Sequence, residues 1–189
     1  MPEGQPPVSP PARPSSLLTP EVLALVGATA GPFEAADLVE HGTIRRFAQA
    51  ALDDDPLYSD ATYASHTRIG RLVAPALLPI YLFGTPLGAP DPLAGAAEPR
   101  FDGTAGNFLI RFGLPPLPVA LTRFLNGGQW LRVCRHPEPG DRVFARSRYV
   151  DIFEKQGSEG PLLFAIAEAT FTNQRAEVLL ICRQTLIWR

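Results

Sequence analysis

The spacing of apolar residues along the chain changes once, near Gly127. Between Ile44 and Phe83 apolar residues recur every three or four positions, which is the period of an amphipathic helix. From Gly127 onward they alternate with polar residues or form short continuous runs, which is typical of strands. The chain therefore predicts an α+β fold in which helices come first and an antiparallel sheet follows.

The helical part predicts three helices joined by polar turns. The first carries its apolar face at Ile44, Phe47, Ala48, Ala51 and Leu52. Thr43 can cap this helix, and Pro56 with the acidic run before it opposes continuation. Asp60 can cap a short second helix over residues 61–67. The third helix, over residues 76–83, is apolar enough to cover a sheet.

Two flanking stretches predict little regular structure. Residues 1–18 are rich in proline and serine, which favours a disordered tail. A helix should start at Thr19-Pro20-Glu21 and run to Val26, and residues 34–40 are a candidate first strand. Residues 84–121 are rich in Gly, Pro and Ala, so we expect a long loop inserted in a single domain over residues 19–189.

Four strands are predicted over residues 129–135, 142–154, 162–173 and 178–188. The turns that separate them are short, which predicts antiparallel neighbours. In the second strand Val143, Ala145, Ser147 and Tyr149 alternate with Arg142, Phe144, Arg146 and Arg148. The first set should face inward and the largely basic second set outward. The third strand is apolar on both faces and should lie centrally in the sheet.

Composition narrows the class of protein. The 189 residues are 46% hydrophobic and 19% charged with a net charge of -2, which describes one soluble domain and gives no reason to expect nucleic acid. Cys134 and Cys182 lie far apart without a CxxC pattern, so we expect two core positions and no zinc site or disulfide. No leader or membrane helix is visible, so we expect a cytoplasmic protein.

The strongest candidate for chemistry is the turn from Asp53 to Tyr58. Three carboxylates stand there at the C-terminal end of a helix, where the helix dipole makes them unfavourable. The sequence has no phosphate-binding loop, dinucleotide fingerprint, nucleophile elbow or HExxH motif, so no cofactor is expected. His41, His66 and His136 lack the mutual spacing of a metal site, and we expect each to be exposed.

Two blocks of the chain resemble the MaoC family of hot-dog proteins. The block FAQAALDDDPLYSDATYASHTRIGRLVAPALLP resembles the N-terminal, FAS1-like dehydratase half of that family. NGGQW, PGDRV and SRYVDIFEKQGSEGPLLFAIAEATFTNQ then follow in the family's order. The resemblance implies a single hot-dog fold, in which a sheet of about five strands wraps around a central helix.

In the hydratases of that family, an Asp and a His five positions later act on an acyl thioester. The resemblance places Asp53 at the catalytic Asp, Asp55 at the usual Asn and Tyr58 at the His. A tyrosine, with a usual pKa of about 10, cannot act as the base near neutrality without a very large shift. Ala74-Pro75-Ala76 also stands where active members commonly have Ala-His-Gly. The resemblance thus implies that this chain holds no catalytic residue of its own.

The same resemblance implies which positions form a wall of the acyl tunnel. They are Tyr58, Pro75, Ala76, Gly127, Gly128 and Gln129. Asn126 stands where many relatives have His. For Gly127 and Gly128 a bulge at the strand start is the more frequent explanation. The outward arginines of the second predicted strand fit either a carrier's phosphates or ordinary solvated decoration of a strand.

The resulting hypothesis is a non-catalytic, substrate-accommodating subunit of a heteromeric (R)-3-hydroxyacyl-thioester dehydratase or enoyl-thioester hydratase of fatty acid or polyketide metabolism. Its partner would be a MaoC-type hot-dog subunit with an intact Asp-x4-His, in a dimer or a dimer of heterodimers. Its substrate would be an acyl-CoA or acyl-carrier-protein thioester. Two alternatives stay open: a stand-alone hydratase or thioesterase that uses Asp53 or Asp55 with Tyr58, and a homodimeric acyl-binding scaffold without turnover.

Overall fold

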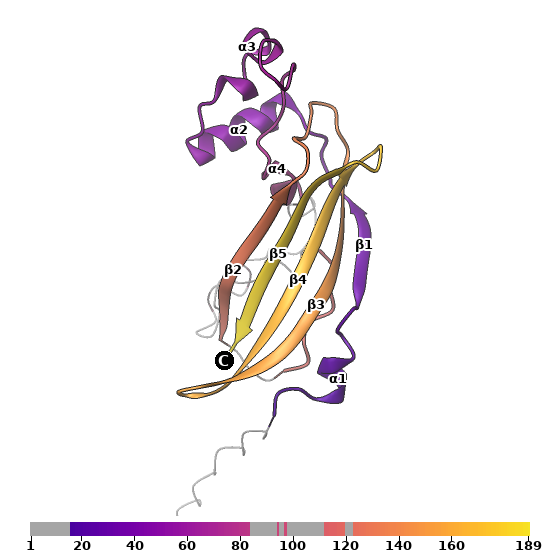
Figure 1. The fold of residues 1–189 in the computed structure, drawn as a ribbon, viewed down its shortest axis with the longest axis vertical. Coiled ribbons are helices and arrows are strands. Elements are labelled where there is room, and N and C mark those ends of the chain that lie inside the picture. The colour runs from indigo at the N-terminus through magenta and orange to yellow at the C-terminus, as the bar shows by residue number, and fades with distance from the viewer. Residues whose placement is uncertain (1–15, 84–93, 95–96, 98–111, 120–122) are drawn as a thin grey trace, which may run out of the picture.

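The computed structural model describes residues 16–83, 94, 97, 112–119 and 123–189. Its strands are β1 (Thr29–Glu34), β2 (Phe124–Val133), β3 (Val143–Gly157), β4 (Gly160–Asn173) and β5 (Val178–Trp188). They form one antiparallel sheet in the order β1-β3-β4-β5-β2 (Figure 1). The predicted α+β class is confirmed, and β4 is the central strand, as its apolar run predicts.

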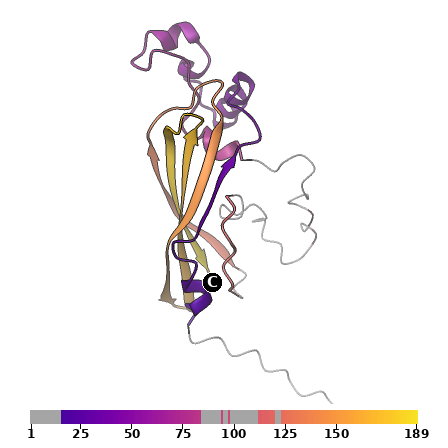
Figure 2. The same cartoon turned by 90° about the vertical axis from the view of Figure 1, so that its right-hand side faces the viewer.

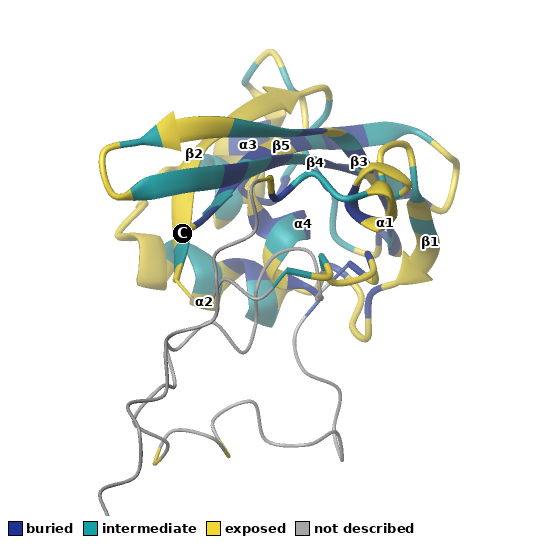
Figure 3. Cartoon of the chain, turned by 90° about the horizontal axis from the view of Figure 1, so that it is seen from below, coloured by how far each residue is buried: buried dark blue, intermediate teal, exposed yellow. Residues whose placement is uncertain are grey.

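The helices lie at the ends and along one face of this sheet. They are α1 (Pro20–Leu23), α2 (His41–Ala51), the 3-10 helix η1 (Pro56–Tyr58), α3 (Ala61–Ser65) and α4 (Leu78–Tyr81). Figure 2 shows α2 and α3 at one end of the sheet and α1 at the other. Figure 3 shows α4 beneath the sheet, so this helix takes the place of the central helix that the sequence predicts.

Strict alternation in β3 sets the inner face of the sheet. Val143, Ala145, Ser147 and Tyr149 are all buried, whereas Arg146 and Arg148 are exposed, as predicted. The same rule continues across β4, where Ala165, Ala167 and Ala169 are fully buried. One face of the sheet is therefore apolar and covered, and the other carries the charged side chains.

The inner face is covered by two apolar clusters, one toward each end. The α4 cluster includes Ile44, Leu78, Phe112 and Phe171, and the α1 cluster includes Val22, Tyr149, Leu163 and Leu186. Each of these side chains is at most 1% exposed. Complete burial of a side chain of this size contributes about 1.5–3 kcal/mol, so the two clusters hold the helices onto the sheet.

The first strand lies earlier than the predicted stretch of residues 34–40. β1 includes Pro32, which has no N–H to donate, yet a proline is tolerated on an edge strand because one side of that strand needs no partner. The ladder to β3 shifts register between Ala30 and Phe33, on either side of this proline. Val39, near the end of the predicted strand, instead exchanges backbone hydrogen bonds with the turn at Gly140 and Asp141.

The prediction that β2 and β3 are neighbours is also wrong, because β2 pairs with β5. The residues between β2 and β3 carry the chain across the end of the sheet and past β5 and β4 (Figure 1). The turn Pro139-Gly140-Asp141 therefore belongs to a crossing connection and not to a hairpin. β3, β4 and β5 do follow one another as antiparallel neighbours, as predicted.

Helix boundaries differ from the predictions by a few residues. α2 begins at His41, so Thr43 lies inside the helix, and the cap position is Glu40, whose side chain makes no capping hydrogen bond. α1 ends at Leu23, three residues before the predicted end at Val26. The second predicted helix ends at Ser65, and the third is reduced to Leu78–Tyr81 because residues 76 and 77 form a turn.

Residues 1–15 of the predicted tail, and most of the predicted loop over residues 84–121, lie outside the described residues. Residues 16–18, which the sequence assigns to the tail, lie against the sheet. Leu17 is buried, and its backbone N–H donates to the carboxylate of Glu154 on β3. The apolar pair Leu17-Leu18 explains this contact, because both side chains join the α1 cluster.

The two cysteines occupy different environments. Cys182 is buried on β5, as predicted, and burial raises the pKa of its thiol to about 11. Cys134 is exposed, contrary to the prediction, because it follows the edge strand β2, whose residues are themselves nearly all exposed. No helix in the described part of the chain is long and apolar enough to cross a membrane.

The outward arginines are largely paired with carboxylates. Arg142 binds Glu34 of β1, and Arg148 binds Glu168 of β4, which also accepts a hydrogen bond from Arg183 of β5. Glu168 itself is only 8% exposed. Burial alone would raise its pKa, but the hydrogen bonds from the two arginines outweigh burial and hold the pKa below the usual value.

We expect Glu168→Gln to lower the free energy of unfolding at pH 7 by about 1–3 kcal/mol, since two guanidinium groups lose their shared acceptor. Because the pKa of Glu168 is lower in the folded chain, its contribution is present above the unfolded pKa and is lost as pH falls through the folded pKa. Urea unfolding at pH 7 and at pH 3 measures both effects. The difference between wild type and variant should shrink at the lower pH.

Glu159→Gln is the matched control, because Glu159 is 81% exposed and lies 3.9 Å from Arg189. Its effect should stay within about 0.5 kcal/mol. An equal loss in both variants would contradict the structural role of Glu168.

Candidate functional site

The acidic turn begins where α2 ends. Leu52 adopts the left-handed conformation, with φ 53° and ψ 37°, and its N–H donates to the Gln49 carbonyl at 3.2 Å. The N–H of Asp53 donates to the Ala48 carbonyl at 2.9 Å. These two bonds satisfy carbonyls at the helix end and turn the chain away from the helix axis. Asp53, Asp54 and Asp55 then follow outside the helix, all exposed.

Two carboxylates of this region have clear local structural roles. Asp55 caps η1, since its Oδ1 accepts from the N–H of Leu57 at 2.9 Å. Asp60 caps α3, since its Oδ1 accepts from the N–H of Tyr63 at 2.9 Å, as the sequence predicts. Asp53 makes a longer contact of the same kind, at 3.4 Å, with the N–H of Asp55. The acidic run is therefore largely explained by the turns it forms.

Tyr58 is the residue of this turn that reaches the protein interior. It is half-buried and packs against the α4 cluster, together with Phe47 and Ile80. Burial raises the pKa of its phenol, and the charges of Asp53 and Asp55 raise it further. The side chain is thus a protonated phenol near neutral pH and does not replace the histidine that an acid–base mechanism needs.

The segment before α4 is held by the connection between β2 and β3. Ala74 donates its N–H to the carbonyl of Pro137 at 2.7 Å, and its own carbonyl lies 3.0 Å from Nδ1 of His136. A carbonyl can only accept, so this contact is a hydrogen bond when the His136 proton is on Nδ1. Pro75 is buried and accepts from the N–H of Leu78 at 3.0 Å.

His136 is half-buried, contrary to the prediction that all three histidines are exposed, whereas His41 and His66 are exposed as predicted. Its role arises from a contact with a residue 62 positions away. The turn Pro139-Gly140-Asp141 beside it is visible in the sequence, but no local pattern indicates this contact.

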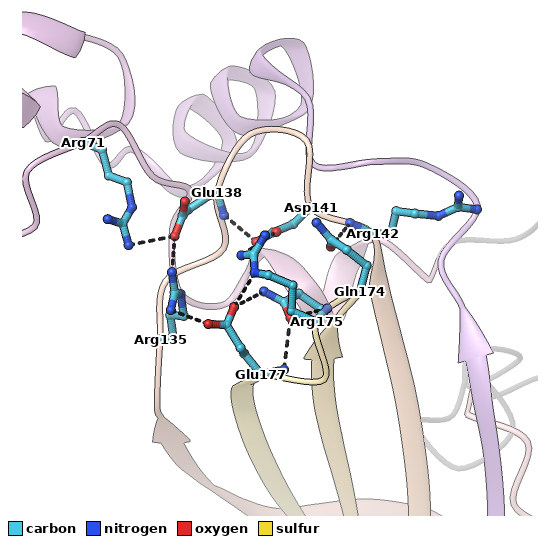
Figure 4. Close-up of polar contacts among 9 residues, drawn as sticks. Arg71, Arg135, Glu138, Asp141, Arg142, Gln174, Arg175 and Glu177 are labelled. Atoms are coloured by element: carbon cyan, nitrogen blue, oxygen red, sulfur yellow. Dashed lines mark hydrogen bonds and ion pairs between the residues drawn. The ribbon is translucent and has the colours of Figure 1, made fainter.

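A network of charged residues fixes this connection (Figure 4). Glu138 binds both Arg71, at 2.9 Å, and Arg135, at 2.7 Å. Arg135 also binds Glu177, in the turn between β4 and β5, at 2.8 Å. Burial opposes the ionisation of Glu138, but the hydrogen bonds from both arginines prevail and hold its pKa below the usual value. Three parts of the chain are thereby joined beside the start of α4.

The glycine pair of β2 forms a bulge. The ladder to β5 shifts register between Asn126 and Gln129, and Gly128 has φ 113°. The Asn126 side chain accepts from the N–H of Gly128 at 2.9 Å. At Gly127 a Cβ atom would lie 2.9 Å from a methyl group of Thr185, so only glycine fits there without a shift. The structural explanation of both glycines is confirmed.

The structure brings some predicted tunnel residues together and keeps others apart. Tyr58 packs against the cluster that contains Ala74 and Leu78, on either side of Pro75 and Ala76. Gln129 lies four residues before the end of β2, which is roughly 13 Å along the strand. The second group of predicted tunnel residues therefore lies on the edge strand, away from Tyr58, and consists of Gly127, Gly128 and Gln129. Among the described residues, no group of three or more His, Cys, Asp or Glu could hold a metal ion.

Comparison with known proteins gives the family. Residues 24–181 match the family model described as the FAS1-like, dehydratase domain region. The chain belongs to this family.

Solved structures extend the comparison to three dimensions. The chain is similar to the ChsH1–ChsH2 complex of Mycobacterium tuberculosis, with a TM-score of 0.64, 16% identity and coverage of 88% of this chain and 90% of that one. It is also similar to the C-terminally truncated HadBC complex of the same organism, a 3R-hydroxyacyl-ACP dehydratase, with a TM-score of 0.56, 18% identity and coverage of 86% and 96%. These likenesses confirm the hot-dog fold.

One curated relative is named only as a UPF0336 protein, from Thermobifida fusca strain YX. It is 29% identical over 116 residues, which are 61% of this chain and 62% of the relative. The match therefore spans less than two thirds of the length of either protein.

The capping role of Asp55 can be tested by substitution. Asp55→Ala should lower the free energy of unfolding by about 0.5–1 kcal/mol, because the N–H of Leu57 loses its acceptor. Asp55→Asn should change stability little, since the amide oxygen can still accept. Urea unfolding measures both, and Asp54→Ala, at an exposed position of the same turn, is the control. Equal stability of all three variants would contradict the capping role.

Proposed function

We propose that this chain is a non-catalytic, substrate-accommodating subunit of a heteromeric (R)-3-hydroxyacyl-thioester dehydratase or enoyl-thioester hydratase. The observation that carries this proposal is that Tyr58, a phenol, stands at the position of the family's catalytic histidine. Dehydration or hydration needs a base whose pKa lies near the working pH. In this family position the chain has a phenol whose pKa is raised by burial and by two neighbouring carboxylates.

The proposal assigns the chemistry to a MaoC-type partner with an intact Asp-x4-His. Two similar structures, ChsH1–ChsH2 and HadBC, are complexes by name, and this supports a partner of the same fold. In such a complex Tyr58, Pro75 and Ala76 would form a wall beside the reacting end of an acyl-CoA or acyl-carrier-protein thioester. Gly127, Gly128 and Gln129 would contact a part of the substrate farther along the sheet.

β2 is the surface that best fits a partner. It is an edge strand of ten residues, nearly all of them exposed, and one side of its backbone has no partner among the described strands. Leu125, Trp130, Leu131 and Val133 are between 37% and 51% exposed. A long apolar edge of this kind invites pairing with another strand. β1, the other edge, is shorter and contains Pro32, which suits it less.

The decisive experiment measures hydration of a short and a long 2-enoyl-CoA by the chain alone and after co-expression with a hot-dog protein that carries Asp-x4-His. We expect activity only in the complex, with a native mass that shows both subunits. In that complex Tyr58→Phe should keep kcat/KM within a few-fold, whereas loss of a true general base costs about 10²–10⁴-fold.

Three outcomes would refute the subunit role. Turnover by the chain alone that is lost in Asp53→Asn would favour a stand-alone hydratase, and release of free thiol would favour a thioesterase. A stable homodimer that binds acyl-CoA without turnover, and that no partner displaces, would favour the scaffold.

The β2 surface is tested by Val133→Lys. A lysine on the edge opposes strand pairing, so the dissociation constant of the complex should rise at least about tenfold. Analytical ultracentrifugation of the complex measures this change. Leu38→Lys is the control, since Leu38 is 43% exposed and lies in the connection between β1 and α2. Equal assembly of both variants and wild type would exclude β2 as the interface.

A further inference from the structure

Gln184 is a polar residue in the middle of the apolar inner face. It lies on β5 opposite Ala167 of β4 on one side and Gln129 of β2 on the other. Its neighbours on the same face of β5 are Cys182 and Leu186, which are fully buried. Gln184 itself is 7% exposed. The alternation of β5 therefore turns this amide toward the interior.

Gln184 also marks the boundary between the two apolar clusters. Cys182 belongs to the α4 cluster and Leu186 to the α1 cluster. The same boundary crosses β4 between Ala169 and Ala167. A ligand that lies along the inner face would pass this amide as it moves from one cluster to the other.

Polar side chains on the inner face of the sheet differ in whether their buried atoms are paired within the described structure. Ser147 donates to the carbonyl of Phe112 at 2.6 Å, and Tyr149 donates to the carbonyl of Pro115 at 2.7 Å. Oε1 of Gln184 is buried and accepts no hydrogen bond from the described residues. Leaving such an acceptor unpaired costs about 1–3 kcal/mol, so its place in the core calls for a partner that the described residues do not supply.

A buried water is a poor candidate for that partner. A water that is held stably in a protein makes about three hydrogen bonds. Around Gln184 the inner face presents the methyl of Ala167, the side chains of Cys182 and Leu186, and the amide of Gln129 on the exposed strand β2. A water there would find two amides and at most a weak thiol. A larger ligand that brings its own donor and also fills apolar space fits these surroundings better.

We propose that Gln184 is a substrate-binding residue whose Oε1 accepts a hydrogen bond from a donor group on an acyl thioester held against the inner face. This inference rests on the proposed function and names a contact within it. The hydrogen-bond donors of a 3-hydroxyacyl-CoA nearest its thioester are the 3-hydroxyl of the acyl chain and the amide N–H groups of the pantetheine arm. Apolar parts of the ligand would lie on either side of the Gln184 amide, against the two clusters.

The test uses the complex of this chain with an Asp-x4-His partner whose histidine is replaced by alanine, so that a 3-hydroxyacyl ligand is not turned over. The substitution in this chain is Gln184→Met, which keeps the length of the side chain and removes the amide. Isothermal titration calorimetry compares 3-hydroxybutyryl-CoA with butyryl-CoA, which lacks only the hydroxyl. A loss of about five- to tenfold in affinity is expected for the hydroxy ligand. An equal loss for both ligands would assign the donor to the pantetheine arm, and a loss for the hydroxy ligand alone would assign it to the hydroxyl.

Thermal unfolding separates binding from structure. Removing an unpaired buried amide should leave the midpoint of the complex unchanged or higher. Gln156→Met, the same substitution at an exposed position near the turn between β3 and β4, should change neither affinity nor midpoint.

Two results would overturn the assignment of Gln184. One is wild-type affinity of Gln184→Met for both ligands. The other is weaker binding together with a midpoint several degrees lower, which would indicate a packing role. A wild-type complex that binds neither ligand would instead refute the proposed function, and the inference with it.

Discussion

The register of β3 against β4 is the constraint on which the rest of the structure depends. These strands pair without interruption from Val143 with Asn173 to Gly157 with Gly160, apart from one shift at Tyr149. Because side chains alternate between faces, a slip of one residue would turn the alanines of β4 outward and Glu168 inward. The pairing thus creates the apolar inner face and, on the opposite face, the bridge from Arg148 through Glu168 to Arg183.

The connection from β2 to β3 links the paired strands of the sheet to the candidate site. Because β2 pairs with β5, its connection to β3 must cross the end of the sheet, and the charged network around Glu138 and Glu177 fixes it there. His136 and Pro137 of that connection hold Ala74. The position of Pro75 and Ala76 therefore depends on residues more than sixty positions later in the sequence, and the site is a property of the whole sheet.

Elements with a strict local pattern could be predicted, and elements set by distant partners could not. β3, β4 and β5 follow directly from alternation and turns, and Asp60 was identifiable as a cap from its position alone. β1 was not predicted at its observed position, because Gly31 and Pro32 interrupt the strand pattern of this short edge strand. The pairing of β2 with β5 carries no local signal. Tyr58 was found through the resemblance to a family, whereas His136 acts through a remote backbone carbonyl.

Gln184 shows that a usable signal can be present in the sequence and still be missed. In the run from Val178 to Trp188 the inward positions are Leu180, Cys182, Gln184, Leu186 and Trp188. A single amide in such a series departs from the apolar pattern, and a departure from a consistent pattern is where function is expected. What the sequence could not give is that the amide has no partner within the described fold.

The acidic turn shows why a family motif does not by itself indicate catalysis. In this chain the capping bonds of Asp55 and Asp60 and the backbone bond from Asp53 to Ala48 would hold the turn whatever stands at position 58. A chain can thus lose the base and keep the shape of the site. The phenol of Tyr58 packs against the α4 cluster, where burial and the two carboxylates raise its pKa, so near neutral pH it is uncharged and is not a base. The acidic residues of the turn therefore indicate the fold, whereas the residue at position 58 indicates whether the turn carries a base.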